Sequence, residues 1–452
     1  MGSFSTLFPQ ILFVIVVLSS CSANIHGQFI TSKASRPKSL VLPLTKDPST
    51  GQHITEIRQR TPLVPLKLTV DLGGRSLWVD CDRNYVSSTY RPARCRSALC
   101  NLANSRSCGD CFDGPKPGCN NDTCSLLPDN SVTKTSTSGE LATDVVAVES
   151  TDGKNPGDTV TAPRLVFTCG STFLLEGLAN GVSGMAGLGR DPVGLPSQFA
   201  SAFSFSRRFA LCLGSSSKGV LFIGEGPYIF QPTGVDVSQN LHYTPLFINP
   251  VSTASSSFEG EKSVEYFVGV TAIKVSREAV PINPALLQID SQGNGGTKIS
   301  TVDGYTVMET SIYRAFTNAF TKAMAVYPGA PRLASVAPFE FCFDSTNLPV
   351  TRVGPPIPGV DIVFQDETVS WTLFGANLMV EVKKNVICLG VLDGGLNPRT
   401  SIVIGAHQFE DNLLEFDIAR SRLGFSETLI YRQTTCSNFN FTSTASTTLQ
   451  VV

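Results

Sequence analysis

The cysteines constrain the fold of this chain more than any other feature of its sequence. Thirteen occur among 452 residues, and all except Cys21 follow residue 23. Seven of the remaining twelve lie between residues 81 and 124, which predicts a loop region held together by disulfide bonds. Their pairing stays open, because twelve cysteines allow too many combinations to choose among. The twelve are Cys81, Cys95, Cys100, Cys108, Cys111, Cys119, Cys124, Cys169, Cys212, Cys342, Cys388 and Cys436.

A zinc cluster is the alternative for the seven clustered cysteines. Structural zinc sites usually supply two ligands from a Cys-x2-Cys spacing and need a second pair to complete the tetrahedron. Only Cys108 and Cys111 have that spacing. We therefore expect disulfide bonds in this region and no metal or cofactor.

The N-terminus predicts export from the cell. An apolar run over residues 11–18 is too short to span a bilayer, and small residues follow it up to Ala23. No Lys or Arg precedes the run, so a short membrane anchor is the alternative. Asn-x-Thr sequons at Asn121 and Asn440 are typical of a secreted glycoprotein. We expect residues 1–23 to be a signal peptide and the mature chain to be extracellular, without a membrane anchor.

Composition favours a turn-rich β fold and gives no reason to expect a nucleic-acid partner. The formal net charge is −2, and only 16% of the residues are charged. The 38 Gly and 28 Pro residues imply many turns. The length exceeds what one core usually organises, so two lobes are expected. A polar, turn-rich stretch at 226–245 places their boundary, with an N-terminal lobe at 24–235 and a C-terminal lobe at 236–452.

Apolar patterning predicts strands in both lobes and few helices. The expected strands cover residues 39–44, 54–58, 139–148, 164–169, 219–224, 266–275, 401–405, 412–417 and 423–425. A glycine-rich turn is expected at 184–190, leading into a short helix around 195–199. Residues 311–326 have helical spacing, with Thr310 or Ser311 as the N-terminal cap.

One loop carries the motif with the clearest chemical meaning. Residues 67–81 run from an apolar strand into Asp71-Leu72-Gly73-Gly74 and continue into Leu-Trp-Val. This outline resembles the first catalytic loop of the pepsin-like aspartic proteases, where Asp-Thr-Gly-Ser is expected. Asp71 and Gly73 match that pattern, whereas Leu72 and Gly74 replace its two small hydroxyl residues.

Aspartic protease chemistry needs a second carboxyl group that shares a water molecule with the first. The resemblance places that group shortly after Gly-Gly-Thr and before a helical Tyr, which here is the position of Ser300. A Ser hydroxyl does not ionise near neutral pH, and Val302 stands where a Gly is expected. Asp290 precedes an Asn-Gly-Gly turn, and Asp303 has no Gly two residues later.

The residue that should cover the cleft is also missing. In active relatives, a Tyr on a flap of the N-terminal lobe covers the cleft. This sequence has no Tyr between Tyr90 and Tyr228. The flap region at 131–136 is polar and small. We therefore predict a protein that is not an enzyme, with Asp71 and Ser300 as remnants of the catalytic pair. Asp71 is expected to be a buried carboxylate held by backbone N–H groups of its loop.

Longer strings narrow the resemblance to a plant group of protease-derived inhibitors. They lie at residues 335–339, 397–408 and 410–414. The group comprises the xyloglucan-specific endoglucanase inhibitors and the extracellular dermal glycoprotein, and it is related to the xylanase inhibitors and basic 7S globulin. The resemblance implies an all-β, bilobal pepsin-like aspartic protease fold with a disulfide-rich insert in the N-terminal lobe. It also implies a monomer secreted to the apoplast or cell wall.

The same resemblance suggests two inhibitory loops, at 327–334 and 393–400, with Arg332 and Arg399 as the residues that bind the target. Xylanase-directed members present a His from the second loop, and here no His precedes His407. The expected partner is therefore a microbial xyloglucan-type endoglucanase. Two solvated surface arginines, a storage or signalling globulin related to basic 7S globulin, and a residual aspartic endopeptidase are the alternatives.

Overall fold

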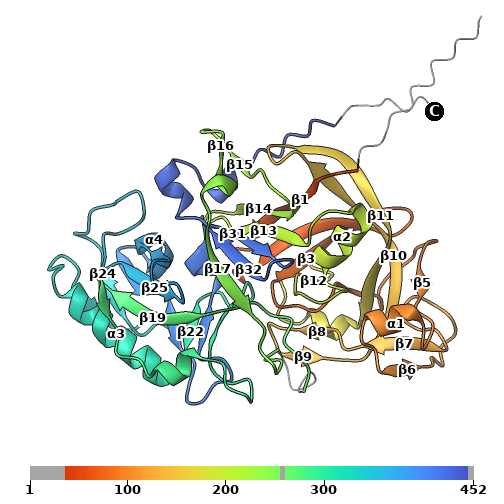
Figure 1. Ribbon diagram of the computed structural model, residues 1–452, viewed down its shortest axis with the longest axis horizontal. Coiled ribbons are helices and arrows are strands. Elements are labelled where there is room, and N and C mark those ends of the chain that lie inside the picture. Colours follow the sequence, from red (N-terminus) through yellow and green to blue (C-terminus); the bar gives the residue numbers. More distant parts are fainter. Residues whose placement is uncertain (1–35, 255–259, 446–452) are drawn as a thin grey trace, which may run out of the picture. The chain divides into compact units, whose positions relative to one another are not determined.

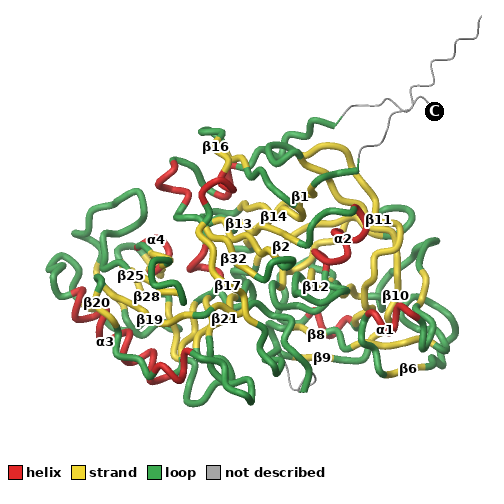
Figure 2. Tube along the Cα trace, viewed as in Figure 1, coloured by secondary structure: helices red, strands yellow, loops and turns green. Residues whose placement is uncertain are grey.

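The computed structural model describes residues 36–254 and 260–445, and the described residues from Pro37 onward belong to one compact unit. The predicted signal peptide lies outside them. Strands predominate and helices are few (Figure 2). The α-helices are α1 Ala98–Leu102, α2 Leu195–Phe203, α3 Thr310–Met324 and α4 Gly375–Leu378. No helix in this part of the chain is long and apolar enough to cross a membrane.

Sixteen strands lie in the first half of the chain, up to residue 236. They are β1 Ser39–Lys46, β2 His53–Gln59, β3 Val64–Asp71, β4 Trp78–Asp80, β5 Arg91–Pro92, β6 Ser107–Gly109, β7 Thr123–Leu126, β8 Asp129–Asn130, β9 Thr135–Ser136, β10 Gly139–Thr151, β11 Pro156–Gly170, β12 Gly184–Gly187, β13 Arg208–Cys212, β14 Lys218–Gly224, β15 Ile229–Phe230 and β16 Val235–Asp236.

The described part of the second half adds another sixteen strands. They are β17 His242–Phe247, β18 Phe267–Val268, β19 Val270–Val275, β20 Glu278–Ala279, β21 Thr297–Ile299, β22 Thr306–Met308, β23 Arg332–Leu333, β24 Cys342–Asp344, β25 Val360–Phe364, β26 Ser370–Leu373, β27 Met379–Lys383, β28 Val386–Leu389, β29 Val391–Asp393, β30 Ile402–Ile404, β31 Leu413–Asp417 and β32 Arg422–Phe425.

The two halves use the same local pairing. In the first half, β3 runs parallel to β12, with Asp71 opposite Gly187. In the second half, β21 runs parallel to β30, with Ile299 opposite Ile404. Asp71 therefore ends one strand of such a pair, and Ser300 directly follows the other.

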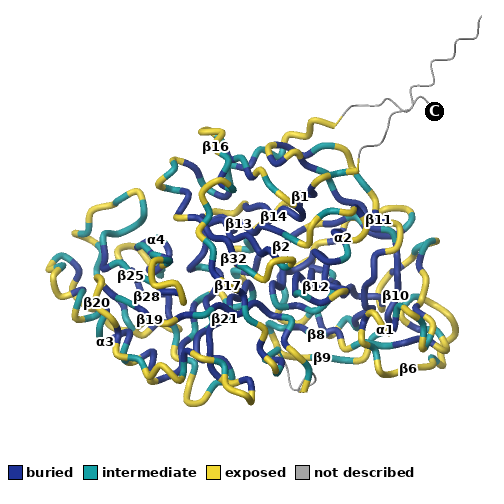
Figure 3. The backbone as a smooth tube through the Cα atoms, viewed as in Figure 1, coloured by how far each residue is buried: buried dark blue, intermediate teal, exposed yellow. Residues whose placement is uncertain are grey.

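The halves are joined by strands that cross between them. β13 of the first half pairs antiparallel with β31 of the second, and β31 pairs in turn with β32. These strands lie side by side in the middle of the ribbon (Figure 1), and they are largely buried (Figure 3). Phe209 of β13 stacks on Phe416 of β31, with 4.8 Å between ring centroids. The joint is thus part of the hydrophobic core and not a flexible linker.

Two local expectations are wrong. Residues 184–187 form strand β12 where a turn was expected, because Gly187 lets β12 approach the Asp71 loop closely: a Cβ there would lie 2.4 Å from the Ser76 carbonyl oxygen. Helix α3 is capped by Glu309, whose carboxylate accepts hydrogen bonds from the backbone N–H groups of Ser311 and Ile312. Glu309 can act as a cap because an ionised carboxylate accepts hydrogen bonds and favours the positive end of the helix dipole.

All twelve cysteines after residue 23 form disulfide bonds, so the zinc interpretation is wrong. Three bridges staple the insert between β5 and β7, and a fourth ties Cys81, at the edge of the Asp71 loop, to β11. The pairs are Cys81–Cys169, Cys95–Cys108, Cys100–Cys124, Cys111–Cys119, Cys212–Cys436 and Cys342–Cys388.

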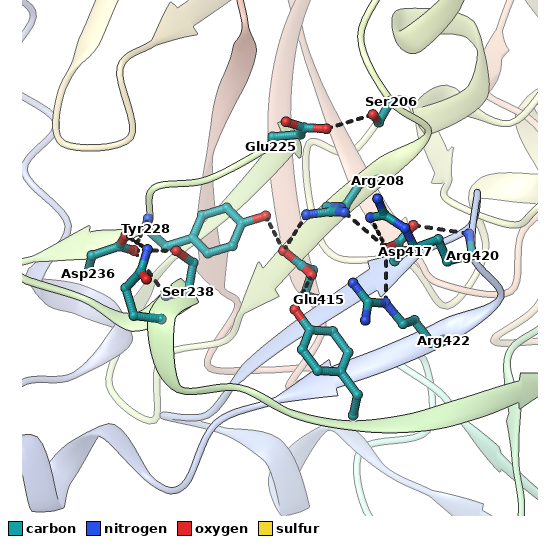
Figure 4. A network of polar contacts seen from close by, with 12 residues as sticks. Ser206, Arg208, Glu225, Tyr228, Asp236, Ser238, Glu415, Asp417, Arg420 and Arg422 are labelled. Carbon is teal, nitrogen blue, oxygen red and sulfur yellow. Dashed lines mark hydrogen bonds and ion pairs between the residues drawn. The ribbon is translucent and has the colours of Figure 1, made fainter.

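A buried ionic network braces the joint between the halves (Figure 4). The Asp417 side chain is fully buried and its Oδ2 lies 3.0 Å from Nη2 of Arg208, 3.2 Å from Arg420 and 3.1 Å from Arg422. Glu415 accepts a hydrogen bond of 2.9 Å from the Tyr228 hydroxyl. Arg208 lies on β13 and the two acids on β31, so the network reinforces the strand pair that joins the halves.

His53 at the start of β2 is expected to make the stability of the fold sensitive to acid. It is buried, and neither ring nitrogen has a hydrogen-bond partner in the described residues. Burial lowers its pKa from 6.5 to about 4, against the opposing attraction of Glu410. The unfolded chain therefore binds a proton between these values that the folded chain does not, and the free energy of unfolding falls as the pH falls from 6.5 to 4.

His53→Leu is expected to remove about 3 kcal/mol of this acid destabilisation. Urea unfolding at pH 4 and pH 7 measures the difference for each variant. His242→Leu, at an exposed position of β17, is the matched control and should keep the wild-type pH dependence. Equal pH dependence of wild type and His53→Leu would contradict the assignment.

Candidate functional site

Asp71 ends β3 and is almost completely buried, with 4% of its surface exposed. Its Oδ1 accepts a hydrogen bond of 2.9 Å from the backbone N–H of Gly73. Its Oδ2 accepts one of 2.6 Å from the hydroxyl of Ser131. Burial raises the pKa of Asp71, and these two hydrogen bonds oppose the rise. The prediction of a buried, hydrogen-bonded carboxylate is confirmed. One hydrogen bond comes from the backbone of its own loop, and the other comes from Ser131, which is distant in the chain.

Ser300 carries a hydroxyl group and not a carboxyl group, so it does not ionise near neutral pH. It is buried, and its Oγ accepts hydrogen bonds from the backbone N–H groups of Val302, at 3.3 Å, and Asp303, at 3.2 Å. The neighbouring Thr301 links the two loops: its hydroxyl donates to the Val70 carbonyl at 2.8 Å and accepts from the Leu72 N–H at 2.9 Å. Ser300 thus stabilises its own turn, and Thr301 holds the turn against the Asp71 loop.

A short hairpin formed by β8 and β9, here called the closing hairpin (residues 129–136), lies against Asp71. Asn130 fixes it to the body of the protein by donating to the carbonyls of Leu174 and Glu176, each at 2.8 Å. The indole N–H of Trp78 donates to the Asp129 carbonyl at 2.9 Å. This is the flap region of the sequence prediction. The sequence showed no Tyr here but gave no indication that Ser131 would contact Asp71.

A pocket of about 430 Å³ lies beside this hairpin and is lined by both halves of the chain. Its walls include Asp71, Ser131 and Lys134 from the first half, and Lys298, Ser300 and Arg399 from the second. Lys298 is paired with the buried Glu265, at 2.6 Å. The pocket therefore lies between the two halves and is lined by polar, charged and apolar residues from both.

Asp129 of the closing hairpin is close enough to Asp71 to be affected by its charge, so it is a candidate for a second catalytic acid. Burial, and then repulsion by the Asp71 carboxylate, raises the pKa of Asp129 to about 7. Both oxygens of Asp71 are already engaged by Ser131 and the Gly73 N–H. In the described residues, the hydrogen-bond partners of Asp71 are therefore a hydroxyl and a backbone N–H, and not a second carboxyl group.

The two arginines predicted to bind a target differ in how far they are buried and in what they contact. Arg332 is the first residue of β23, is exposed, and holds its guanidinium 4.2 Å above the ring centre of Phe341. Arg399 is half-buried and lines the pocket, while Leu396 at the tip of its loop is 76% exposed. Neither arginine forms an ion pair with any described residue.

Each loop has a contact with the first turns of α3, although the loop at 327–334 begins just beyond the last residue of that helix, Met324. Thr310 donates from its hydroxyl to Asp393, at the start of the second loop, over 2.7 Å. Tyr313, one turn later, contacts the ring of Phe341, on which Arg332 rests. Helix α3 therefore connects the two predicted loops through Thr310 and Tyr313.

The two sequons are in accessible positions but carry other contacts. Asn121 is exposed, and its Oδ1 accepts a hydrogen bond of 2.8 Å from the Cys111 N–H. Asn440 is half-buried, and its Oδ1 accepts from the Thr442 N–H at 3.0 Å. Glycosylation at both sites stays a prediction.

Family models for the N-terminal and C-terminal parts of xylanase inhibitors match residues 53–225 and 265–427. A probable aspartic proteinase GIP2 of Nicotiana benthamiana is 59% identical over 98% of this chain and all of that one. Gamma conglutin 1 of Prunus dulcis is 40% identical over 99% and 98%. Basic 7S globulin of Glycine max is 38% identical over 89% and 92%.

Solved structures agree with these sequence matches. The crystal structure of edgp superposes with a TM-score of 0.88 at 59% identity, covering 90% of this chain and 99% of that one. Conglutin gamma from lupine seeds gives a TM-score of 0.77 at 38% identity, with the same coverage. The predicted all-β, bilobal pepsin-like fold with its disulfide-rich insert is confirmed.

Proposed function

Because this chain belongs to the plant xylanase-inhibitor family with a pepsin-like fold, we propose that it is a secreted inhibitor of microbial glycoside hydrolases that degrade the cell wall. Its proposed target is a xyloglucan-specific endo-β-1,4-glucanase, met in the apoplast or cell wall by a monomer. The observation that carries the proposal is the pair of arginine loops beside α3, whose guanidinium groups have no carboxylate partner in the described residues.

The chemistry of the target explains why an arginine suits this purpose. A retaining glycosidase holds two carboxyl groups about 5–5.5 Å apart around the bond that it cleaves. A guanidinium can pair with carboxylates through two parallel hydrogen bonds and stays charged at every physiological pH. An arginine in the cleft therefore occupies the place of the positively charged transition state, and the substrate is excluded.

Proteolysis is not part of the proposed function. Asp71 accepts a hydrogen bond from the Ser131 hydroxyl, and the position that the family resemblance gives to the second acid is Ser300. The name of the relative from Nicotiana benthamiana refers to a proteinase, so the activity is worth measuring. We expect no cleavage of peptide substrates at acid pH.

A mixing assay tests the proposal. The purified chain is added to a xyloglucan-active endoglucanase, and the release of reducing sugar is followed. We expect the rate to fall to the background level at a stoichiometric ratio, with no peptide cleavage in parallel. An unchanged rate would reject the target, and peptide cleavage abolished by Asp71→Asn would restore the protease interpretation.

The second candidate is a storage or signalling globulin, which the likeness to gamma conglutin and basic 7S globulin favours. Such a protein needs no arginine directed at an enzyme. The mixing assay separates the two functions, because a globulin without inhibitory loops leaves the hydrolase fully active.

A further inference from the structure

We infer that the closing hairpin forms a second part of the inhibitory surface, in which Lys134 contacts the hydrolase and Asp71 positions the hairpin. This inference rests on the proposed function. It gives the remnant aspartate a role that does not involve proteolysis, and it brings the N-terminal half of the chain into an interface otherwise supplied by the second half.

Lys134 lies where such a contact requires it. It occupies the turn between β8 and β9 with a φ of 57°, and it is exposed. It lines the same pocket as Arg399, from the opposite half of the chain. Its ammonium group has no hydrogen bond or ion pair with any residue that the structure describes. Two unpaired cations thus border one pocket from its two sides, and the lining between them also includes the acids Asp71, Asp129, Glu265 and Asp303.

The hairpin that carries Lys134 is held in place at several points. The Asn130 side chain donates to two carbonyls near residue 175, and its Oδ1 accepts from the N–H groups of Val132 and Thr133. Ser131 is bonded to Asp71 at 2.6 Å. A contact residue on a fixed loop loses little conformational entropy on binding, so it contributes more to affinity than one on a mobile loop.

Asp71 is the buried end of this support. Its carboxylate cannot rotate freely, because the Gly73 N–H holds Oδ1 while Ser131 holds Oδ2. The bond reaches the hairpin three residues before Lys134. Asp71 therefore acts through Ser131 as a positioning residue, and it needs only a hydrogen-bonding group in this place, not a proton-transfer partner.

The partner that fits this surface is the carbohydrate cleft of a retaining glycoside hydrolase. Such a cleft contains the two catalytic carboxyl groups. A guanidinium from one side and an ammonium from the other match a negative cleft, and a charge at the rim of an interface acts mainly on the association rate and its salt dependence.

The test compares association rates of four variants with the same endoglucanase at low and high salt. Lys134→Gln is expected to associate about two- to fivefold more slowly at low salt, the effect of an exposed ion pair, and to show a weaker salt dependence. Lys218→Gln, at an exposed position of β14, is the matched control and should behave as wild type. Asp71→Ala should slow association as much as Lys134→Gln, whereas Asp71→Asn should retain the wild-type rate because an amide can still bond to Ser131.

The coupling between the two residues distinguishes positioning from a general loss of stability. Lys134→Gln should have little further effect in the Asp71→Ala background, while thermal unfolding monitors the stability of every variant. If wild type inhibits and Lys134→Gln associates as fast as Lys218→Gln, this inference is overturned and the proposed function stands. If wild type does not inhibit, both fail. If Asp71→Ala does not fold, equal rates for wild type and Lys134→Gln still overturn the inference.

Discussion

Replacing Arg399 with Gln is expected to weaken inhibition of a xyloglucan endoglucanase about 30-fold or more, and Arg332→Gln should have an effect of the same order. Truncating one partner of a buried, hydrogen-bonded charge pair costs about 2–5 kcal/mol, because the other charge is left buried and unpaired. In this case the unpaired charges are the catalytic carboxylates of the enzyme. Gln keeps much of the side-chain length and removes the charge.

The inhibition constant of each variant, measured with the same enzyme, checks this prediction. Arg352→Gln is the matched control, since Arg352 is exposed and lies outside both loops. It should inhibit like wild type. If Arg332→Gln and Arg399→Gln also inhibit like wild type, the two loops do not bind the target, even where the protein is a true inhibitor. A loss at only one position would identify the loop that enters the cleft.

Replacing Asp417 with Ala is expected to lower the free energy of unfolding by about 3–5 kcal/mol, the usual cost of removing one partner from a buried ion pair. Asp417 is fully buried and its carboxylate is shared by Arg208, Arg420 and Arg422. Its loss leaves the guanidinium of Arg208, itself largely buried between the two halves, without one of its two acids. Asp158→Ala, at an exposed position of β11, should change the stability by less than about 0.5 kcal/mol.

The loss of stability in Asp417→Ala is also expected to depend on pH. Burial alone would raise the pKa of Asp417, but attraction by Arg208 and hydrogen bonds from Arg420 and Arg422 outweigh it and lower the pKa below 3.8. The group therefore stabilises the fold above pH 3.8, and this contribution is lost as the pH falls through the lowered value. Urea unfolding at pH 7 and below pH 3 should show the gap between wild type and Asp417→Ala narrowing in acid. A gap that stays constant would mean that packing, not charge, explains the loss.

Much of this protein could be predicted from local sequence. Apolar patterning predicted longer strands such as β1, β2, β10, β14 and β31, because a half-buried strand needs period-two alternation whatever its neighbours are, whereas most strands of two or three residues were not predicted. The loop at Asp71 and the Ser at position 300 predicted a protease-like scaffold without protease chemistry. The scaffold is confirmed, and the loss of the chemistry stays a prediction. The even number of cysteines after residue 23 indicated disulfides, since oxidation in a secreted chain does not depend on the details of the fold.

The tertiary structure decided which distant groups meet. The disulfide pairing, the bond from Ser131 to Asp71, and the pocket that Arg399 shares with Lys134 all join residues that are far apart in the chain. Gly187 lies in a strand and not in the predicted turn for the same reason: its strand, β12, pairs with β3 and β4, which are distant in the chain. A sequence pattern reports what each segment can form by itself, whereas these contacts depend on how the two halves fold against each other. The sequence therefore predicted that Asp71 lacks a partner acid, and the structure shows that Asp71 accepts a hydrogen bond from Ser131.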